Sequence, residues 1–266
     1  MSTTIPLDFV TDIWNIFLLV LVRVSGMFYL SPIFGRRNIP NYFKAGFCFF
    51  FSIIVSYTIP VPDLSAYNTL LSYAVLIAKE LIIGLMLGFI SYAFFSSIYI
   101  AGQLIDMRIG FGMVSVLDPI GSAQIPISAD FYVIFATLYM LVTDSHHLLI
   151  KALADSYTLI PAGQVFFDGE LINQVVDMFG KVFVIGFKIA APVTATILIT
   201  DIALGIISKS MPQMNVFMLG LPVKLILGMS IILITIGAFK GIVNNIIMNS
   251  IEEIYRFLQE SRGAVP

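Results

Sequence analysis

Charged side chains occur inside long apolar stretches of this sequence, where ionisable groups are rare. They are Arg23, Lys79, Glu80, Lys188, Asp201 and Lys240. A charge at the centre of a bilayer costs at least about 2.5–3.5 kcal/mol, so each is expected to face a partner or water. We expect Arg23 to pair with Glu80, and Asp201 to pair with Lys188 or Lys240. Because the acids do not recur on one helix face, ion pairs that hold helices together are favoured over an ion or proton relay.

Few other residues suggest chemistry. His146 and His147 are neighbours, and adjacent side chains on a helix point about 100° apart, so we interpret them as an interfacial pair rather than as metal ligands. A single cysteine, Cys48, excludes an internal disulfide and a multi-cysteine metal site. The sequence has no GxxxxGK[ST] phosphate loop, no GxGxxG after a strand and no HExxH. We therefore predict that the chain is not an enzyme and uses no cofactor and no metal.

Composition indicates what kind of environment surrounds the elements that position these charges. The chain has 266 residues, of which 59% are hydrophobic and 11% charged, and its mean hydropathy is +0.98. A soluble domain carries about 25% charged residues, so the surroundings of this chain must be largely lipid. The net charge of −2 gives no electrostatic footprint for nucleic acid. The acidic N-terminus lacks a basic region and does not have the pattern of a cleaved signal peptide.

Six apolar stretches approach or exceed the roughly 20 residues needed to cross the hydrocarbon core. They span about 9–30, 43–59, 70–101, 131–149, 176–207 and 216–248. The third, fifth and sixth are longer than a bilayer requires, so they must tilt, kink or project beyond it. We predict an all-α polytopic membrane protein with about six long apolar helices, forming a single membrane-embedded domain over residues 1–266.

The distribution of basic residues predicts the orientation in the membrane. Arg36, Arg37 and Lys44 follow the first stretch, and Lys209 and Lys224 flank the turn between the last two. The alternate connections are mainly acidic. By the positive-inside rule, the N-terminus lies outside and the basic connections lie in the cytoplasm.

Two helices carry the GxxxG spacing that lets helix backbones approach closely. Gly84 and Gly88 form one such pair, and Gly237 and Gly241 form another. This spacing predicts close packing but does not identify the partner helix.

Residues 102–127 are apolar, yet they are rich in residues that interrupt helices. The interrupting residues are Gly102, Gly110, Gly112, Pro119, Gly121 and Pro126. Non-helical apolar backbone at membrane depth is tolerated only inside protein or along a cavity. The segment is either a plug, with glycines for mobility and Met and Phe as a deformable seal, or a packing segment without a gating role. Composition alone favours the packing segment.

Four groups of residues along the chain form a recognisable set of motifs. They are Arg23 with Ser31–Gly35 and Ile39-Pro40; Lys79–Gly84 with Gly88; Gly102, Asp106, Gly110 and Asp118-Pro119; and Asp201, Gly205, Pro212–Phe217, Gly220, Pro222 and Lys224. These motifs resemble the FliR family of flagellar export-gate proteins, and the resemblance covers about residues 9–250. The C-terminal block, Pro212–Phe217 with the residues after it, is the most specific of these motifs.

The resemblance implies a subunit of the type III export gate, located in the bacterial inner membrane within the flagellar basal body. Its helices would form long hairpins. Its partners would be FliP and FliQ in a hetero-oligomer, FlhB and FlhA, membrane lipid, and the unfolded proteins that pass through the channel. The homologous gate of virulence injectisomes is the close alternative, and a self-contained secondary transporter of a small solute is the distant one.

The resemblance also assigns roles to residues, and it reverses the balance for the glycine-rich segment in favour of a plug. The plug residues would be Gly102, Asp106, Gly110, Phe111, Gly112, Met113 and Val114. The turn at about 208–224 would be a cytoplasmic tip that meets FlhB. The tip residues would be Lys209, Pro212, Asn215, Phe217, Pro222 and Lys224.

Overall fold

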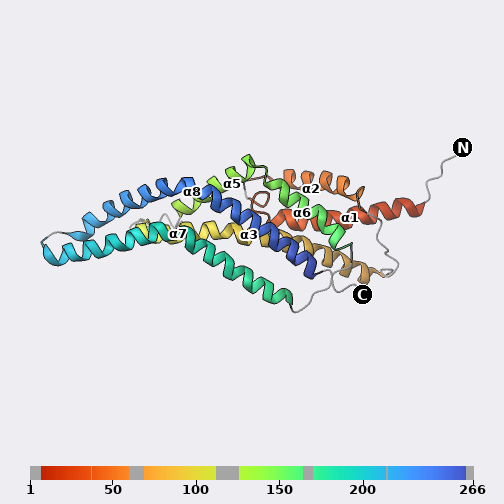
Figure 1. Cartoon of the computed structure of the whole chain (residues 1–266). Helices are drawn as coiled ribbons and strands as arrows, with labels where there is room; N and C mark the ends of the chain where they lie inside the picture. The colour runs from red at the N-terminus through yellow and green to blue at the C-terminus, as the bar shows by residue number, and fades with distance from the viewer. Residues whose placement is uncertain are drawn as a thin grey trace. The chain divides into compact units, whose positions relative to one another are not determined.

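The computed structural model describes residues 7–36, 38–59, 69–111, 126–163, 170–213 and 215–261, and within these ranges the chain is helical with no strand (Figure 1). The helices are α1 (Leu7–Leu30), α2 (Asn41–Ser56), α3 (Leu70–Ile109), α5 (Ile127–Val142), α6 (His146–Leu159), α7 (Glu170–Ser210) and α8 (Val216–Glu260). Four are long and apolar enough to cross a membrane, or up to five if α5 and α6 form one broken span. The predicted all-α polytopic membrane fold is confirmed.

Three long helices exceed the bounds expected from hydropathy. Helices α3, α7 and α8 contain 40, 41 and 45 residues. At 1.5 Å per residue each is about 60 Å long or more, roughly twice the hydrocarbon core. Their ends continue into more polar sequence because backbone hydrogen bonding, not hydropathy, decides where a helix stops.

The expected stretch 131–149 is wrong as a single helix. Helix α5 ends at Val142 and α6 begins at His146, with a turn between them. Asp144 in this turn has a positive φ of 53°, which a continuous helix does not allow. Helix α2 has 16 residues and is about 24 Å long. It is therefore shorter than the hydrocarbon core and could cross it only where the surrounding bilayer is thinned.

The chain divides into two compact units, and their boundaries fall inside α3, α7 and α8 and in the turn between α5 and α6. Unit 1 comprises Met1–Ala93, Asp144–Met178 and Met248–Pro266. Unit 2 comprises Phe94–Thr143 and Phe179–Ile247.

In unit 1, α1 is packed against α2 through aromatic rings. Phe28 of α1 lies 4.5 Å from Phe34, 5.1 Å from Phe47 and 6.3 Å from Phe51, measured between ring centroids. Such offset and tilted ring contacts each add about 0.5–1.5 kcal/mol beyond the area they bury. The turn between the two helices, after Ser31-Pro32, is thereby fixed on an aromatic core.

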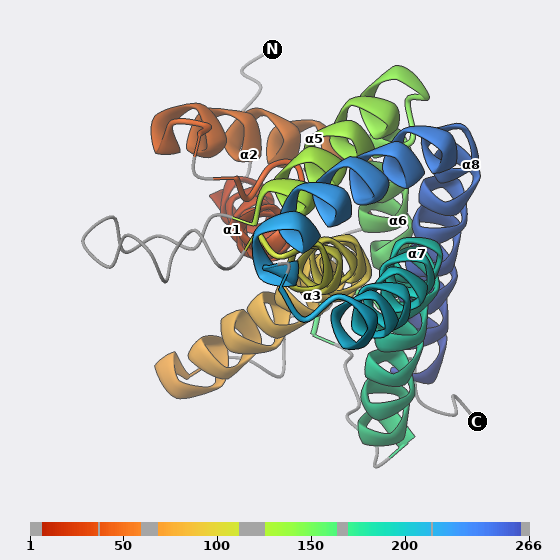
Figure 2. The same ribbon diagram turned by 90° about the vertical axis from the view of Figure 1, so that its left-hand side faces the viewer.

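In unit 2, α7 and α8 run antiparallel as a long hairpin, and α5 lies along α8 (Figures 1 and 2). The ring centroid of Tyr132 lies 4.7 Å from that of Phe239, and the Phe135 centroid lies 5.8 Å from it. Pro212 lies in the hairpin turn, and Asn215 caps the start of α8 by accepting a hydrogen bond from the Met218 N–H at 3.3 Å.

Candidate functional site

Arg23 of α1 is fully buried and makes polar contacts to α3 and to the C-terminal end of α6. Its Nε donates to Glu80 Oε2 at 2.7 Å. Nη1 donates to Ser156 Oγ at 3.1 Å, and both Nη1 and Nη2 donate to the Ile160 carbonyl at 3.2 Å. The guanidinium lies 4.1 Å from the centroid of the Tyr157 ring. The predicted pairing of Arg23 with Glu80 is therefore present, and it joins α1, α3 and α6.

The second carboxylate oxygen of Glu80 is also used. Oε1 accepts the Gly163 N–H at 2.9 Å, just after α6 ends. The side chains of Arg23 and Glu80 are 0% exposed. A proton or ion relay needs access to water, so this burial supports an assembly contact over an ion pathway. A buried pair gains most when its remaining donors and acceptors are satisfied, as they largely are here.

Glycines bring α1 and α3 together beside this pair. A Cβ added at Gly84 would collide with the carbonyl oxygen of Arg23, and one added at Gly88 would lie 2.6 Å from the carbonyl oxygen of Met27. Gly26 faces α3 in the same way, because its Cβ would lie 3.0 Å from the Leu81 carbonyl oxygen. The first GxxxG therefore packs backbone against backbone within the chain. Gly237 and Gly241 of the second face open space.

The glycine-rich segment begins later than predicted. Helix α3 continues to Ile109, so Gly102 and Asp106 are helical and the predicted loop start at residue 102 is wrong. The helix ends at Gly110, whose φ is +100°. The N–H groups of Gly110 and Phe111 both donate to the Asp106 carbonyl at 3.1 Å, which is the pattern of a glycine-terminated helix. Gly102 does not break α3, since helix propensity is overridden by packing.

Gly102 and Asp106, which were predicted to belong to the plug, take part in helix packing and helix capping. Gly102 allows α5 to approach, because a Cβ there would collide with the backbone of Ala129. Both carboxylate oxygens of Asp106 accept the Ser128 N–H at 3.1 Å. Helix α5 follows Pro126, which supplies no side-chain cap, so Asp106 of α3 caps it instead. Asp106 is 6% exposed.

The remaining predicted plug residues are only partly described. Phe111 lies in the turn after α3 and is half-buried. Gly112, Met113 and Val114 lie outside the described residues, so the structure does not test the predicted plug.

The predicted partner of Asp201 is wrong. Its carboxylate pairs with Lys224 across the α7–α8 hairpin, and both side chains are partly exposed. Lys188 and Lys240 are exposed on α7 and α8. Lys224 was expected to belong to the cytoplasmic tip and was therefore left out of the pairing, whereas it lies about two helical turns into α8, opposite Asp201 of α7.

The other predicted tip residues occupy the end of this hairpin. Lys209 is in the last turn of α7, and Pro212 is exposed in the connection. Asn215 caps α8, and Pro222 lies inside it. Phe217 is in α8, but its side chain lies outside the described set.

Two polar contacts, one buried and one half-buried, were not found from the sequence. Gln174 Nε2 donates to Glu253 Oε2 at 3.1 Å, and Glu253 is 4% exposed. The Tyr255 hydroxyl donates to Asp155 Oδ2 at 2.5 Å. No contact was expected for the C-terminal charges, because the last apolar stretch was expected to end near residue 248. A run of helix-favouring residues from 249 to 260 was the available signal.

Comparison with known proteins places the chain in a family. Residues 14–250 match the family of bacterial export proteins, family 1. The chain belongs to this family. It is 34% identical to the flagellar biosynthetic protein FliR of Bacillus subtilis (strain 168), over 94% of this chain and 96% of that protein. The FliR proteins of Aquifex aeolicus (29%) and Escherichia coli K12 (23%) match 92% and 95% of this chain, and 95% and 94% of their own lengths.

These matches confirm the resemblance to FliR drawn from the motifs. The chain is a membrane-embedded component of a flagellar protein-export apparatus. The match reaches residue 250, so it includes Arg23, Glu80, Asp106, all of α7, and α8 up to residue 250.

Proposed function

We propose that this chain is a channel-forming subunit of the flagellar type III export gate in the bacterial inner membrane, within the basal body, where it assembles with FliP and FliQ. It is a passive conduit for unfolded flagellar proteins. The observation that carries this proposal is the length and the apolar exposure of the α7–α8 hairpin.

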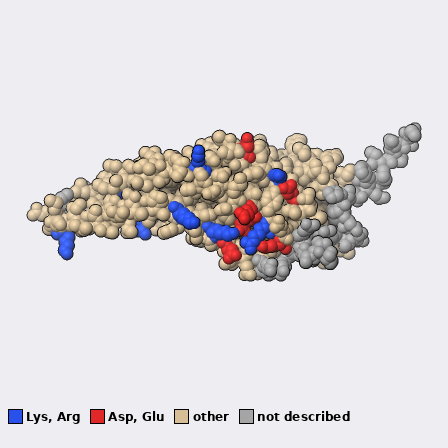
Figure 3. All heavy atoms as spheres, viewed as in Figure 1, with Lys and Arg blue, Asp and Glu red and all other residues tan. Residues whose placement is uncertain are grey.

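Both helices of the hairpin expose apolar side chains along their length. In the most apolar 18-residue stretch of each helix, 11% of the residues are buried in α8 and 33% are buried in α7. The face shown in Figure 3 carries few charged residues over the hairpin. The large exposed side chains include Phe183, Phe187, Ile199, Ile202, Ile206, Ile226, Leu233 and Ile234.

Lipid cannot cover all of this surface. The hydrocarbon core is about 30 Å thick, whereas each helix is about 60 Å long, so lipid covers about half of an upright hairpin. Large exposed apolar patches mark interfaces with other proteins. Neighbouring subunits with complementary apolar helices would cover the remainder, as expected for a hetero-oligomeric gate.

Native mass spectrometry of the chain, alone and co-expressed with FliP and FliQ, tests this assignment. We expect one copy of the chain in a large hetero-oligomer. Phe187→Glu, at an exposed apolar position, is expected to reduce the assembled fraction, and the neighbouring exposed Lys188→Ala is the matched control. A stable monomer or homodimer that ignores these partners would overturn the proposal and favour a self-contained transporter.

We also infer roles for the segment that follows α3 and for the tip of the α7–α8 hairpin. Phe111, Met113 and their neighbours would occlude the resting channel, with Gly110 and Gly112 as pivots. The support from the described residues is the positive φ of Gly110. The sequence carries no nucleotide-binding motif, so energy would come from other components of the apparatus.

The hairpin tip, with Lys209, Pro212 and Asn215, would lie in the cytoplasm and meet FlhB, with FlhA nearby. Lys209 at the tip, with Lys224 further along α8, supports this side by the positive-inside rule. A photo-crosslinking amino acid at Asn215 should yield a crosslink to FlhB. The same probe at Tyr57, which is exposed after α2, should not. Equal crosslinking from both positions would count against the assignment.

A further inference from the structure

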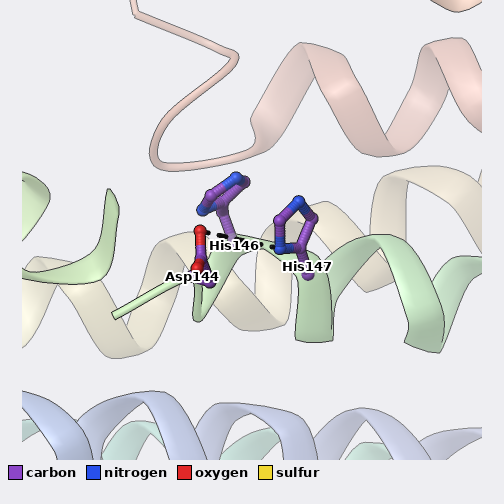
Figure 4. Close-up of side chains that lie close together, drawn as sticks. All are labelled: Asp144, His146 and His147. Carbon is purple, nitrogen blue, oxygen red and sulfur yellow. Dashed lines mark ion pairs between the residues drawn. The ribbon is translucent and has the colours of Figure 1, made fainter. Parts of the chain in front are cut away.

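Three potential metal ligands gather on the turn that leads into α6. Asp144, His146 and His147 offer one carboxylate oxygen and two imidazole nitrogens, which lie within 4.8 Å of one another (Figure 4). Nδ1 of His147 is 3.8 Å from Oδ1 of Asp144, and the two imidazole centroids are 4.1 Å apart. The expectation that the adjacent histidines diverge is therefore wrong. It assumed a regular helix, whereas His146 is the first residue of α6 and follows a turn.

Backbone hydrogen bonds hold the turn. The His147 N–H donates to the Asp144 carbonyl at 2.9 Å, and the Leu148 N–H donates to the Ser145 carbonyl at 3.1 Å. Asp144 has a φ of 53°, a conformation that Asp and Asn tolerate better than most residues. The Cα atoms of the three ligand residues are thus fixed relative to one another.

One imidazole nitrogen in the cluster is unsatisfied. Nδ1 of His146 is buried and has no hydrogen-bond partner within the described ranges of the chain. A buried polar atom without a partner is costly, and a neutral imidazole offers a lone pair there that a cation can bind. The Asp144 and His147 side chains are 75% and 66% exposed, so the described part of the chain leaves both side chains uncovered.

We propose that Asp144, His146 and His147 bind a divalent transition-metal ion of the zinc and copper class. Two nitrogens and one carboxylate oxygen suit these ions, whereas Mg²⁺ and Ca²⁺ prefer oxygen ligands. Three protein ligands leave room for water in the fourth position.

The geometry requires a small closure of the ligands. Bonds of about 2.0–2.1 Å in a tetrahedral site place ligand atoms about 3.4 Å apart. Rotation of the exposed Asp144 and His147 side chains supplies the movement, and such rotations take picoseconds to nanoseconds. The positive end of the α6 dipole opposes a cation here, and the carboxylate of Asp144 offsets this opposition.

The composition of the chain allows binding through imidazole to be assigned to this turn. His146 and His147 are the two histidines of the sequence, and its single cysteine, Cys48, is buried. Coordination of an ion by imidazole nitrogen must therefore come from this turn.

The experiment is a Zn²⁺ titration by isothermal calorimetry of the full chain in maltoside detergent, with any histidine tag removed. We expect one ion per chain. His147→Ala and Asp144→Asn should each weaken binding at least tenfold, since even second-shell changes cost about 10–100-fold. Both change exposed side chains, and Asn preserves the tolerance for positive φ, so the fold should be retained. Glu252→Gln removes another exposed carboxylate and should leave binding unchanged.

Electron paramagnetic resonance of the chain with Cu²⁺ provides an independent readout. Coupling to two imidazole nitrogens is expected in the parent chain, with one remaining in His147→Ala. Absence of Zn²⁺ binding would overturn the proposal. Binding of equal strength in the parent chain, His147→Ala and Asp144→Asn would overturn it too, because it would show adventitious binding only.

Discussion

At the scale of single residues, the buried pair of Arg23 and Glu80 has the largest expected energetic effect. Both side chains are fully buried, and the guanidinium also donates to Ser156 and to the Ile160 carbonyl. Removing one member leaves the other charge without compensation in a water-poor interior. Such losses cost more than the intact pair contributes.

Glu80→Ala is therefore expected to destabilise the chain by about 3–5 kcal/mol. The double change Arg23→Met with Glu80→Leu should cost less than Glu80→Ala, because no unpaired charge remains. Thermal unfolding in detergent, followed by circular dichroism, measures both. Lys188→Met, at an exposed charge on α7, should unfold close to the parent chain. A double variant that is less stable than Glu80→Ala would contradict this account.

At the scale of elements, α3 acts on its neighbours through backbone contacts. Its glycines admit α1, and Gly102 admits α5. Its Asp106 caps α5, whose own sequence supplies no capping side chain. The contacts of α3 with α1 and α5 thus depend on the absence of a Cβ at its glycines and on the carboxylate oxygens of Asp106. They depend on these more than on the total apolar area that the helices bury.

The two GxxxG motifs predict opposite responses to the same substitution. Gly84→Ala forces a Cβ against the Arg23 carbonyl, and overpacking of this kind costs about 1–3 kcal/mol. Gly237→Ala meets open space and should be neutral or stabilising by up to about 1 kcal/mol, because alanine favours helix. Unfolding temperatures of the two variants, measured on the chain alone, compare them. Equal destabilisation would argue against the α1–α3 contact.

The cap that Asp106 provides can be tested separately. Asp106→Ala should cost about 0.5–2 kcal/mol, the range for loss of an N-cap, and Asp106→Asn should cost less because one acceptor oxygen remains. Hydrogen exchange should accelerate for the first-turn amides of α5, residues 127–130. Gln103→Ala, at an exposed position on the same helix, is the matched control. Unchanged exchange at the Ser128 amide would rule out the cap.

At the scale of the whole molecule, the exposed apolar surface of the α7–α8 hairpin is the dominant feature. A monomer with such a surface is a component of a larger assembly or is covered by lipid. The proposed channel role therefore makes predictions only for the assembled complex.

Deleting residues 110–116 should make membranes that contain the assembled complex permeable to small ions, while assembly is retained. The reason is that the proposed plug would be removed, whereas the described helices would keep all their residues. Ion permeability of cells or vesicles measures the effect, with native mass spectrometry as the control for assembly. Unchanged permeability in a fully assembled complex would count against the plug.

The sequence by itself determined the solvent, the fold class and the family. Low charge and high hydropathy require lipid, and the apolar stretches place both ends of α1 and α2 to within three residues and the first residues of α3 and α8. It also identified the pairing of Arg23 with Glu80, because a buried charge must find an opposite one and few were available.

The tertiary structure decided the contacts between residues that lie far apart in the sequence. It placed Lys224 rather than Lys188 or Lys240 against Asp201, and it made Asp106 the cap of a different helix. It continued α3 through Gly102, because close approach of Ala129 favours glycine there despite its poor helix propensity. Hydropathy reports only the average environment of a stretch, whereas partners and helix ends are set by individual atoms brought together from distant segments.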